Sequence, residues 1–329
     1  MNGAAFNQNI FSLNSSAQFE QAALELFSYQ YEHNRVYSSF CDLLNVFPEE
    51  VTSLEKIPFL PISFFKTHEV RCLQKKPEKI FYSSATTGQV PSRHFVYDLA
   101  LYEKSFQSAF HQFYGNPEEY AILALLPSYL ERGNSSLVYM AQHLIQHSAH
   151  PLSGFYLNEW EALEKTLSSL EQKKQKTILL GVSFALLDFI EKHSLLLEHT
   201  IIMETGGMKG RRTELVRDAL HERLKKGFGV QAIHSEYGMT ELLSQAYALK
   251  NGRFKTPPWM QVQVRSTEDP FEILEVGRTG ALNIIDLANR DSCAFIATQD
   301  LGKKHPDHSF EVLGRFDHAE IRGCNLMVL

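Results

Sequence analysis

The chain has 329 residues, 44% of them apolar and 21% charged, a balance that is typical of globular proteins and argues against disordered or fibrous classes. A formal net charge of -6, with no basic stretch interleaved with aromatic residues, argues against nucleic acid as a partner. Neither a membrane span nor a signal peptide is visible in the sequence, so we expect a cytoplasmic protein.

The N-terminal region, about residues 1–57, is expected to be helical. Ser15 and Gln18 have the spacing of a capping box, and apolar residues then recur at helical intervals from Phe19 to Phe27. This pattern predicts an amphipathic helix that belongs to the scaffold of the protein.

Residues 83–91, Ser-Ser-Ala-Thr-Thr-Gly-Gln-Val-Pro, form a loop rich in hydroxyl groups. The loop follows the β-prone residues 80–82 and precedes a helix that we expect Asp98 to cap. Hydroxyls and turn N–H groups donate to phosphate oxygens, so the pattern favours a phosphate-binding loop. The alternative is an ordinary surface turn, which uses the same residue types. The motif of a P-loop NTPase is missing.

From Tyr120 onward, short apolar runs alternate with helical patterns. Such alternation predicts a largely parallel sheet covered by helices on both faces. The expected strands are 121–126, 177–180, 200–203 and 230–234, and the expected helices are 135–147, 184–192 and 212–225.

Residues 235–242, Ser-Glu-Tyr-Gly-Met-Thr-Glu-Leu, follow the last of these strands. Ligands gather at such strand ends in open α/β sheets. Glu241 is suited to a hard cation such as Mg²⁺, Thr240 offers a hydroxyl beside it, and Tyr237 offers a face for a base. The alternative is the first turn of a capped helix.

After Lys250 the sequence is rich in strand and turn signals, which indicates an α+β addition to the sheet. Strands are expected at 262–265, 281–286 and 295–297. No repeat or low-complexity linker interrupts the chain up to about residue 312, so we treat 1–312 as one multi-lobed domain.

The hydroxyl-rich loop and the acidic segment together resemble two motifs of the adenylate-forming superfamily of acyl-CoA synthetases, adenylation domains and luciferases. Three further segments occur in the order which that superfamily uses, at 205–207, 298–302 and 314–317. Within the superfamily the chain resembles the LuxE-type acyl-protein synthetases, to which residues 58–66 and 321–324 are also similar.

This resemblance implies an α/β fold: a multi-lobed adenylate-forming large domain with mixed and parallel sheets. The acyl-adenylating domain would span 1–312, and 313–329 would be a hinge and C-terminal stub with Asp317 at the hinge. The small C-terminal domain of the superfamily and its catalytic Lys would be largely absent.

The resemblance also implies ATP and Mg²⁺ as cofactors and assigns roles to individual residues. The β- and γ-phosphates would be held by Ser83, Ser84, Thr86, Thr87 and Gly88. Thr240 would contact the α-phosphate and Glu241 would ligate the metal ion. The adenine would lie beside Gly206 and Gly207, with Tyr237 and Gly238 against its ring. Asp300 would accept the ribose hydroxyls, and Arg315 would lie near the ribose or phosphate.

Two residues depart from the superfamily pattern. Ala85 replaces a usual Gly, and Ser92 stands where many relatives place a Lys after Pro91. Lys66 and Arg93 are the candidates for supplying the missing positive charge.

The four cysteines, Cys41, Cys72, Cys293 and Cys324, lack the spacings of a disulfide framework or a zinc site, so reduced thiols are expected. In the resembled family a Cys carries the acyl thioester. Cys324, with Arg322 nearby to favour its thiolate, is our candidate, alongside Thr86, Thr240 and Glu241 as catalytic residues. The alternative for this cysteine is a small buried side chain.

The expected activity is that of an ATP-dependent acyl-protein synthetase, which activates a carboxylic acid, expected to be a fatty acid, and transfers it to a protein thiol. The acceptor would be a reductase, transferase or carrier protein. One alternative is a ligase that loads coenzyme A or a carrier protein, and another is a degenerate subunit that binds nucleotide or acyl groups without catalysis.

Overall fold

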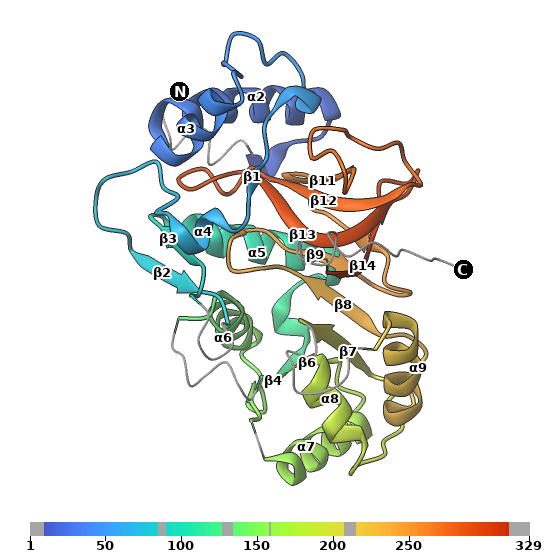
Figure 1. Ribbon diagram of the computed structural model, residues 1–329. Coiled ribbons are helices and arrows are strands. Elements are labelled where there is room, and N and C mark those ends of the chain that lie inside the picture. The colour runs from blue at the N-terminus through green and yellow to red at the C-terminus, as the bar shows by residue number, and fades with distance from the viewer. Residues whose placement is uncertain (1–9, 85–89, 127–133, 158, 207–214, 316–329) are drawn as a thin grey trace.

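The computed structural model describes residues 10–84, 90–126, 134–157, 159–206 and 215–315. Figure 1 shows two helices, α2 and α3, above a group of antiparallel strands, and a group of parallel strands with their helices at the opposite end. No helix in these ranges has the length and apolar character that crossing a membrane requires.

The amphipathic helix expected after Ser15 is present in the structure. α2 (Ser16–His33) begins after Ser15, whose side chain accepts a hydrogen bond from the Gln18 amide at 3.3 Å, and α3 (Arg35–Leu43) follows. The side chain of Gln30 donates to the carbonyls of Asn289 and Arg290 at 2.9 and 2.8 Å. These buried bonds tie the helical region to the loop that joins two central strands.

One large sheet of 12 strands organises the described residues. Its parallel part contains β5 (Gly154–Phe155), β4 (Ala121–Leu125), β6 (Thr177–Val182), β7 (Thr200–Thr205) and β8 (His234–Tyr237), in that spatial order. Its antiparallel part continues from β8 through β9 (Ala246–Ala248), β10 (Phe254–Lys255), β14 (Phe310–Arg315), β13 (Phe295–Lys304), β12 (Thr279–Asp286) and β11 (Met260–Arg265). β1 (Leu60–Pro61) pairs in parallel with β13. The fold is therefore the mixed α/β sheet that the sequence predicts.

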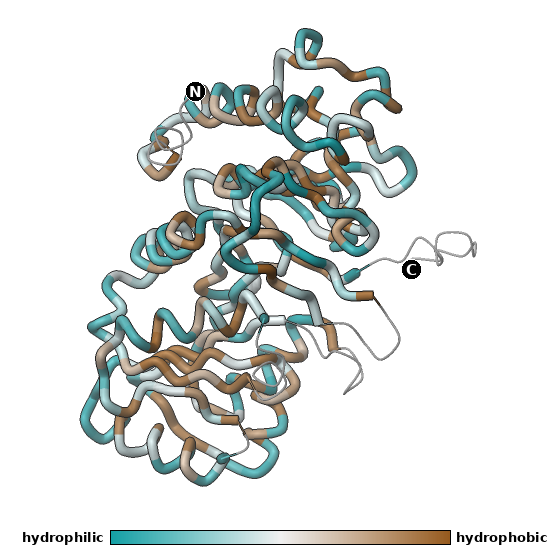
Figure 2. Tube along the Cα trace, turned by 90° about the vertical axis from the view of Figure 1, so that its left-hand side faces the viewer, coloured by the Kyte–Doolittle hydropathy of each residue, from teal (hydrophilic) through white to brown (hydrophobic). Residues whose placement is uncertain are grey.

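Helices cover the parallel part of the sheet. In Figure 1, α6 (Ser136–Ser148) lies on one side of these strands and α9 (Arg217–Phe228) on the other, with α7 (Trp160–Gln172) and α8 (Ser183–Ile190) at the lower end. Every residue of β4 and β6 is buried, as expected for strands covered on both faces. Figure 2 shows the same concentration of hydrophobic residues along these strands.

A separate two-stranded hairpin carries the hydroxyl-rich loop. β2 (Lys79–Tyr82) pairs antiparallel with β3 (Arg93–Val96), and the short helix α4 (Phe64–Thr67) contacts β3. α5 (Leu99–Tyr114) follows, with the predicted cap: the Asp98 side chain accepts from the Leu101 amide at 2.9 Å.

Several sequence predictions differ from the structure. The strand expected at 230–234 begins at His234 and runs to Tyr237, because the polar residues Ser235 and Glu236 have buried partners and fit within the sheet. Of the helix expected at 212–225, the described part begins at Arg217, and 212–214 lie outside the described residues. β3, β9, β10 and β14 were not predicted, since they are short or carry charged residues.

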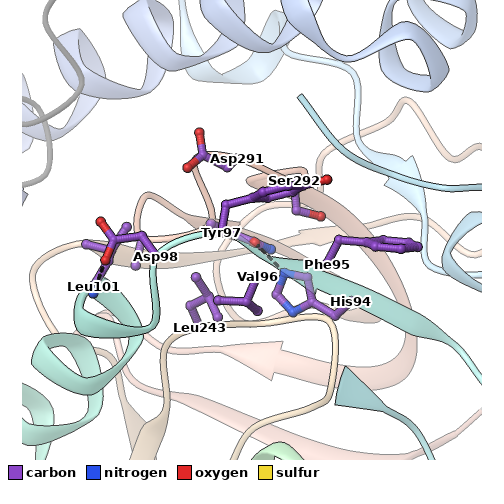
Figure 3. A pocket seen from close by; sticks show the side chains of 11 residues that line it. His94, Phe95, Val96, Tyr97, Asp98, Leu101, Leu243, Asp291 and Ser292 are labelled. Atoms are coloured by element: carbon purple, nitrogen blue, oxygen red, sulfur yellow. Dashed lines mark hydrogen bonds between the residues drawn. The ribbon is translucent and has the colours of Figure 1, made fainter. Parts of the chain in front are cut away.

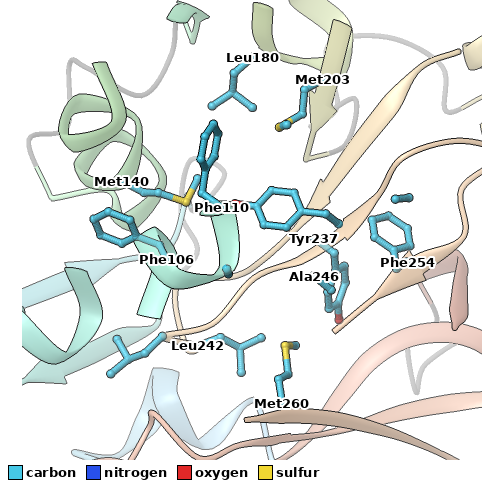
Figure 4. Close-up of a cluster of buried hydrophobic side chains, with 14 of the residues drawn as sticks. Phe106, Phe110, Met140, Leu180, Met203, Tyr237, Leu242, Ala246, Phe254 and Met260 are labelled. Carbon is cyan, nitrogen blue, oxygen red and sulfur yellow. The ribbon is translucent and has the colours of Figure 1, made fainter. Parts of the chain in front are cut away.

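The two parts of the sheet share one hydrophobic core. Figure 4 shows Phe106 of α5, Met140 of α6, Tyr237 of β8 and Phe254 of β10 in one buried cluster. The junction between the parallel and antiparallel parts, at β8 and β9, is therefore firmly packed.

Candidate active site

The acidic segment lies at the junction of the two sheet parts. Tyr237 ends β8 and pairs with Ala246 of β9, and between these strands the chain turns, with the Leu242 amide donating to the Met239 carbonyl at 3.1 Å. Thr240 and Glu241 lie in this turn, and no helix begins there. The alternative interpretation as a capped helix start is therefore wrong.

Gly238 is required by close packing in the same turn. A Cβ at this position would lie 2.5 Å from Oε1 of Glu236 and 3.3 Å from Cγ of Gln245. The exposed backbone of Gly238 thus passes over a buried carboxyl group, which would have to shift for a larger residue to fit.

Glu241 is buried, with 5% of its surface exposed. Burial raises the pKa of its carboxyl group, while a hydrogen bond from Ser92 and the charges of Arg315 and Lys66 act in the opposite direction. These three neighbours come from different parts of the chain. Mg²⁺ uses one or two such carboxylates together with substrate phosphates, and the nearby cations suit the anionic phosphates.

The hydroxyl-rich loop emerges beside this turn. At its base the Ser83 amide donates to the Ser92 carbonyl at 3.1 Å, and the Ser92 amide donates to Oγ of Ser83 at 2.8 Å. Nδ1 of His94, on β3, lies 2.7 Å from the Thr240 carbonyl oxygen. The base of the loop and the Thr240–Glu241 turn, far apart in sequence, therefore lie in contact.

Of the remaining residues predicted for this loop, the structure describes only Ser84. Ser84 is exposed at its base, whereas Thr86, Thr87 and Gly88 lie outside the described residues. Of the two candidate cations, Arg93 lies 3.7 Å from the carboxylate of Glu69 and 5.6 Å from the ring centre of Phe95, while the charge of Lys66 acts on Glu241. Lys66 is therefore the better placed of the two.

Tyr237, Asp300 and Arg315 form a second group at the junction. The Tyr237 hydroxyl donates to Oδ2 of Asp300 at 2.8 Å, and Nε of Arg315 donates to Oδ1 at 3.0 Å. Asp300 is buried, but the Arg315 side chain is 76% exposed. Because the charge of Arg315 also acts on Glu241, this group borders the acidic turn.

Gly206 follows β7, the neighbour of β8. Its φ of +66° is in the left-handed region that favours glycine, and its carbonyl accepts from Oγ of Ser183 at 2.9 Å. Gly207 lies outside the described residues. The end of β7 is thus fixed next to the end of β8.

Sequence reasoning missed Glu236 as a functional candidate. Its carboxyl group accepts a hydrogen bond from the Thr205 hydroxyl, and burial, opposed by that bond and reinforced by the charge of Glu204, raises its pKa to about 7. The polar residue in an otherwise apolar strand was the available signal. His94, buried on β3, was missed because the strand itself was not predicted.

Within the described ranges, no group of three or more His, Cys, Asp and Glu side chains is arranged to hold a metal ion. Mg²⁺ often uses one or two carboxylates together with substrate phosphates, so a single buried carboxylate such as Glu241 fits that mode of binding.

Three cysteines are buried and unsuited to nucleophilic chemistry. Burial raises the pKa of the Cys41 thiol to about 12, and it raises the pKa of Cys72 and Cys293 well above the usual range. Cys324 lies outside the described residues.

The fold is similar to known adenylate-forming enzymes. 2-Hydroxyisobutyryl-CoA ligase in the postadenylation state with 2-HIB-AMP matches with a TM-score of 0.68 and 13% identity, covering 92% of this chain and 69% of that one. ATP-bound MatB from Rhodopseudomonas palustris matches with a TM-score of 0.54 and 17% identity, covering 72% of this chain and 47% of that one. An ATP-bound RpMatB-BxBclM chimera gives a TM-score of 0.55 with the same identity and coverage.

The matched region thus spans about half the length of the MatB structures, 47% in each case. At these identities the similarity shows that the fold is shared. No curated protein sequence is a significant match. The family model described as "Acyl-protein synthetase, LuxE" matches residues 9–329, nearly the whole chain. This chain therefore belongs to the LuxE acyl-protein synthetase family.

Proposed function

We propose that the protein is an ATP-dependent acyl-protein synthetase that activates a carboxylic acid as its acyl-adenylate. The observation that carries this proposal is the contact between the base of the hydroxyl-rich loop and the Thr240–Glu241 turn. We infer that the loop hydroxyls and the buried carboxylate of Glu241 face one volume, as binding a metal-complexed triphosphate requires. Membership of the LuxE family supports the same activity.

The first step is the reaction of a carboxylate with ATP. An oxygen of the carboxylate attacks the α-phosphorus, the bond from that phosphorus to the bridging oxygen breaks, and pyrophosphate leaves. Negative charge rises on the phosphate oxygens, where Thr240 and the loop hydroxyls Ser83, Ser84, Thr86 and Thr87 are proposed to donate hydrogen bonds. Each preorganised donor is worth roughly 3 kcal/mol. A magnesium ion held by Glu241 would neutralise part of that charge.

We assign binding of the nucleoside to the second group of residues. Asp300 is proposed to accept the ribose hydroxyls, for which its two buried carboxylate oxygens provide paired acceptors already oriented by Tyr237 and Arg315. Gly206 and Gly207 would lie beside the adenine, with Tyr237 and Gly238 against its ring.

The second step transfers the acyl group to a thiol. Sγ of Cys324, as thiolate, would attack the acyl carbonyl carbon, and AMP would leave with the bond between that carbon and the phosphate oxygen broken. Burial of Cys41, Cys72 and Cys293 supports Cys324 as the acceptor within this chain. A partner protein such as a reductase, transferase or carrier would then receive the acyl group.

We also propose that residues 1–312 are the acyl-adenylating domain and that 313–329 form a hinge and C-terminal stub. β14 continues to Arg315, so the proposed hinge residue Asp317 follows closely after the last described strand.

ATP–pyrophosphate exchange with a panel of fatty, short-chain and aryl acids tests the proposed activity. We expect exchange with fatty acids, and mass spectrometry after incubation with ATP and the active acid should find an acyl adduct that Cys324→Ser removes. Acylation of coenzyme A in place of Cys324 would favour the ligase alternative. ATP binding without exchange for any acid would favour a non-catalytic subunit and contradict the proposal.

A further inference from the structure

Behind the Thr240–Glu241 turn lies a small pocket, lined by residues of β3 and of the loop between β12 and β13. Figure 3 shows His94 in this pocket, below Tyr97 and close to Leu243. We propose that His94 and Asn289 form a clamp that positions the Thr240–Glu241 turn for adenylation. This inference deepens the proposed function and rests on it for the identity of the reaction.

His94 is the first half of the clamp. It is 1% exposed, and its ring nitrogens lie 2.7 Å from the Thr240 carbonyl oxygen and 2.9 Å from Oδ1 of Asn289. Both of these oxygens can only accept and the neutral ring carries one proton, which we assign to Nδ1 because its contact with Thr240 is the shorter of the two. The phenyl ring of Phe65 packs edge-on at 6.0 Å between ring centres, which fixes the plane of the imidazole.

Asn289 is the second half. Its Nδ2 group donates to the Glu241 carbonyl at 2.7 Å and to the Cys293 carbonyl at 2.8 Å. Both of its protons are thereby used on carbonyl oxygens, which fixes the amide with Oδ1 toward His94. Two successive carbonyls of the turn, those of Thr240 and Glu241, are thus held by two side chains that contact each other.

The opposite side of the turn is held as well. The amides of Leu243 and Ser244 donate to Oδ2 of Asp286 at 2.8 and 3.0 Å. The backbone is therefore fixed through its carbonyls and through its N–H groups. The clamp contacts Thr240 and Glu241 through their backbone carbonyls and not through their side chains, and the Glu241 carboxyl instead accepts from the Ser92 hydroxyl.

Burial removes the polar groups of the clamp from water, which costs free energy. Burial lowers the pKa of His94 to about 4, although both of its hydrogen bonds favour the protonated ring. The neutral ring has one proton for two acceptors, so one of the four contacts lacks a proton. Apolar residues in place of His94 and Asn289 would avoid the missing proton, but they would leave the carbonyls of Thr240 and Glu241 without hydrogen-bond donors.

For catalysis, the clamp would keep the side chains of Thr240 and Glu241 in the positions that the reaction requires. Donors and metal ligands act in the transition state only when they are preorganised, and displacement by about 1 Å can slow a reaction by about a hundredfold. Loss of the clamp should therefore lower kcat more than it raises KM for ATP.

The test compares His94→Ala, His94→Asn and Asn289→Ala with the wild-type chain by ATP–pyrophosphate exchange. Amide hydrogen exchange of residues 238–245 is measured on the same samples. We expect both Ala variants to lower kcat by about tenfold or more, with KM for ATP changed by less than about threefold, and to speed amide exchange in this segment. His94→Asn should recover most of kcat, because its amide nitrogen takes the position of Nδ1 and still donates to Thr240.

Thr177→Val is the matched control. Thr177 is equally buried, and its hydroxyl donates to the Gln175 carbonyl at 3.0 Å at the start of β6, away from the turn and from the β12–β13 loop. It should lower the melting temperature without lowering kcat. An equal loss of kcat in Thr177→Val, or unchanged kcat and amide exchange in His94→Ala, would overturn the clamp. A wild-type chain with no pyrophosphate exchange would instead overturn the proposed function, and amide exchange would still decide whether the clamp holds the turn.

Discussion

The parallel and antiparallel parts of the sheet present their candidate site residues in different ways. In the parallel part these residues follow the ends of strands: Gly206 comes after β7, and Thr240 and Glu241 lie in the turn after β8. In the antiparallel part Asp300 lies within β13, directly opposite Arg315 of β14 in the ladder. The parallel part therefore presents its site residues on turns, and the antiparallel part presents them on paired strands.

This difference suggests that the turn serves the chemical step and that the ladder serves substrate binding. A turn can bring several donors and a carboxylate around a reacting phosphate, but it needs side chains such as Ser92 and His94 to hold it. A ladder pair is rigid without such help and is suited to binding an unchanging part of a substrate, such as a ribose. We therefore expect substitutions in the turn to affect chemistry and those in the ladder to affect binding.

Glu241→Gln should have the largest effect. Loss of the carboxylate removes the proposed metal ligand, and kcat for ATP–pyrophosphate exchange should fall by about a hundredfold or more. Glu198→Gln, an exposed change before the start of β7, is the control and should retain full activity. If Glu241→Gln kept its rate, the turn would have no part in the chemistry.

Glu236→Gln should change the pH dependence of stability. The pKa of Glu236 is 4.5 in the unfolded reference and about 7 in the folded chain, so between these values the folded chain retains a proton that the unfolded chain has released. The wild-type free energy of unfolding should therefore fall as pH rises from 5 to 7, and the variant should remove about 2 kcal/mol of that fall. Urea unfolding at several pH values measures it. Identical slopes for wild type and variant would contradict the raised pKa.

Asp300→Asn tests the ladder part. It weakens the paired acceptor proposed for the ribose hydroxyls, and we expect KM for ATP to rise by about tenfold, with a smaller change in kcat. Exchange kinetics at varied ATP concentration separate the two constants. A fall in kcat as large as that of Glu241→Gln would remove the distinction between turn and ladder.

Tyr237→Phe should have the smallest effect. It removes one buried hydrogen bond to Asp300 but keeps the aromatic packing against Phe254 and Phe310, so stability should fall by about 1 kcal/mol. Thermal unfolding measures the loss. A decrease of several kcal/mol would mean that the hydroxyl also holds the ladder pair in place.

The sequence was most informative where structure is local. Short apolar runs predicted β4, β6 and β7 closely, because strands buried on both faces are continuously apolar, and a helical period predicted α6. β9 and β10 were missed because strands of three and two residues carry no period. The strand β8 was shifted because Ser235 and Glu236 are polar, and only tertiary partners explain their burial.

The sequence predicted only those parts of the candidate site that lie within local motifs. Ordered motifs identified Tyr237, Glu241, Asp300 and Arg315, and the structure brings these four together. The pairing of Asp300 with Arg315 depends on the register of β13 and β14, which no local pattern encodes. His94 and Asn289 meet across 195 positions of sequence, and nothing in either segment marks them as partners.

The central claim is that the hydroxyl-rich loop and the Glu241 turn bind the same triphosphate. A crystal structure of the protein with Mg²⁺ and an ATP analogue that resists cleavage between the α- and β-phosphates tests it most directly. We predict β- and γ-phosphates within hydrogen-bonding distance of residues 83–88 and a Mg²⁺ ion ligated by Glu241 and phosphate oxygens. A nucleotide bound with its phosphates remote from either segment would contradict the account.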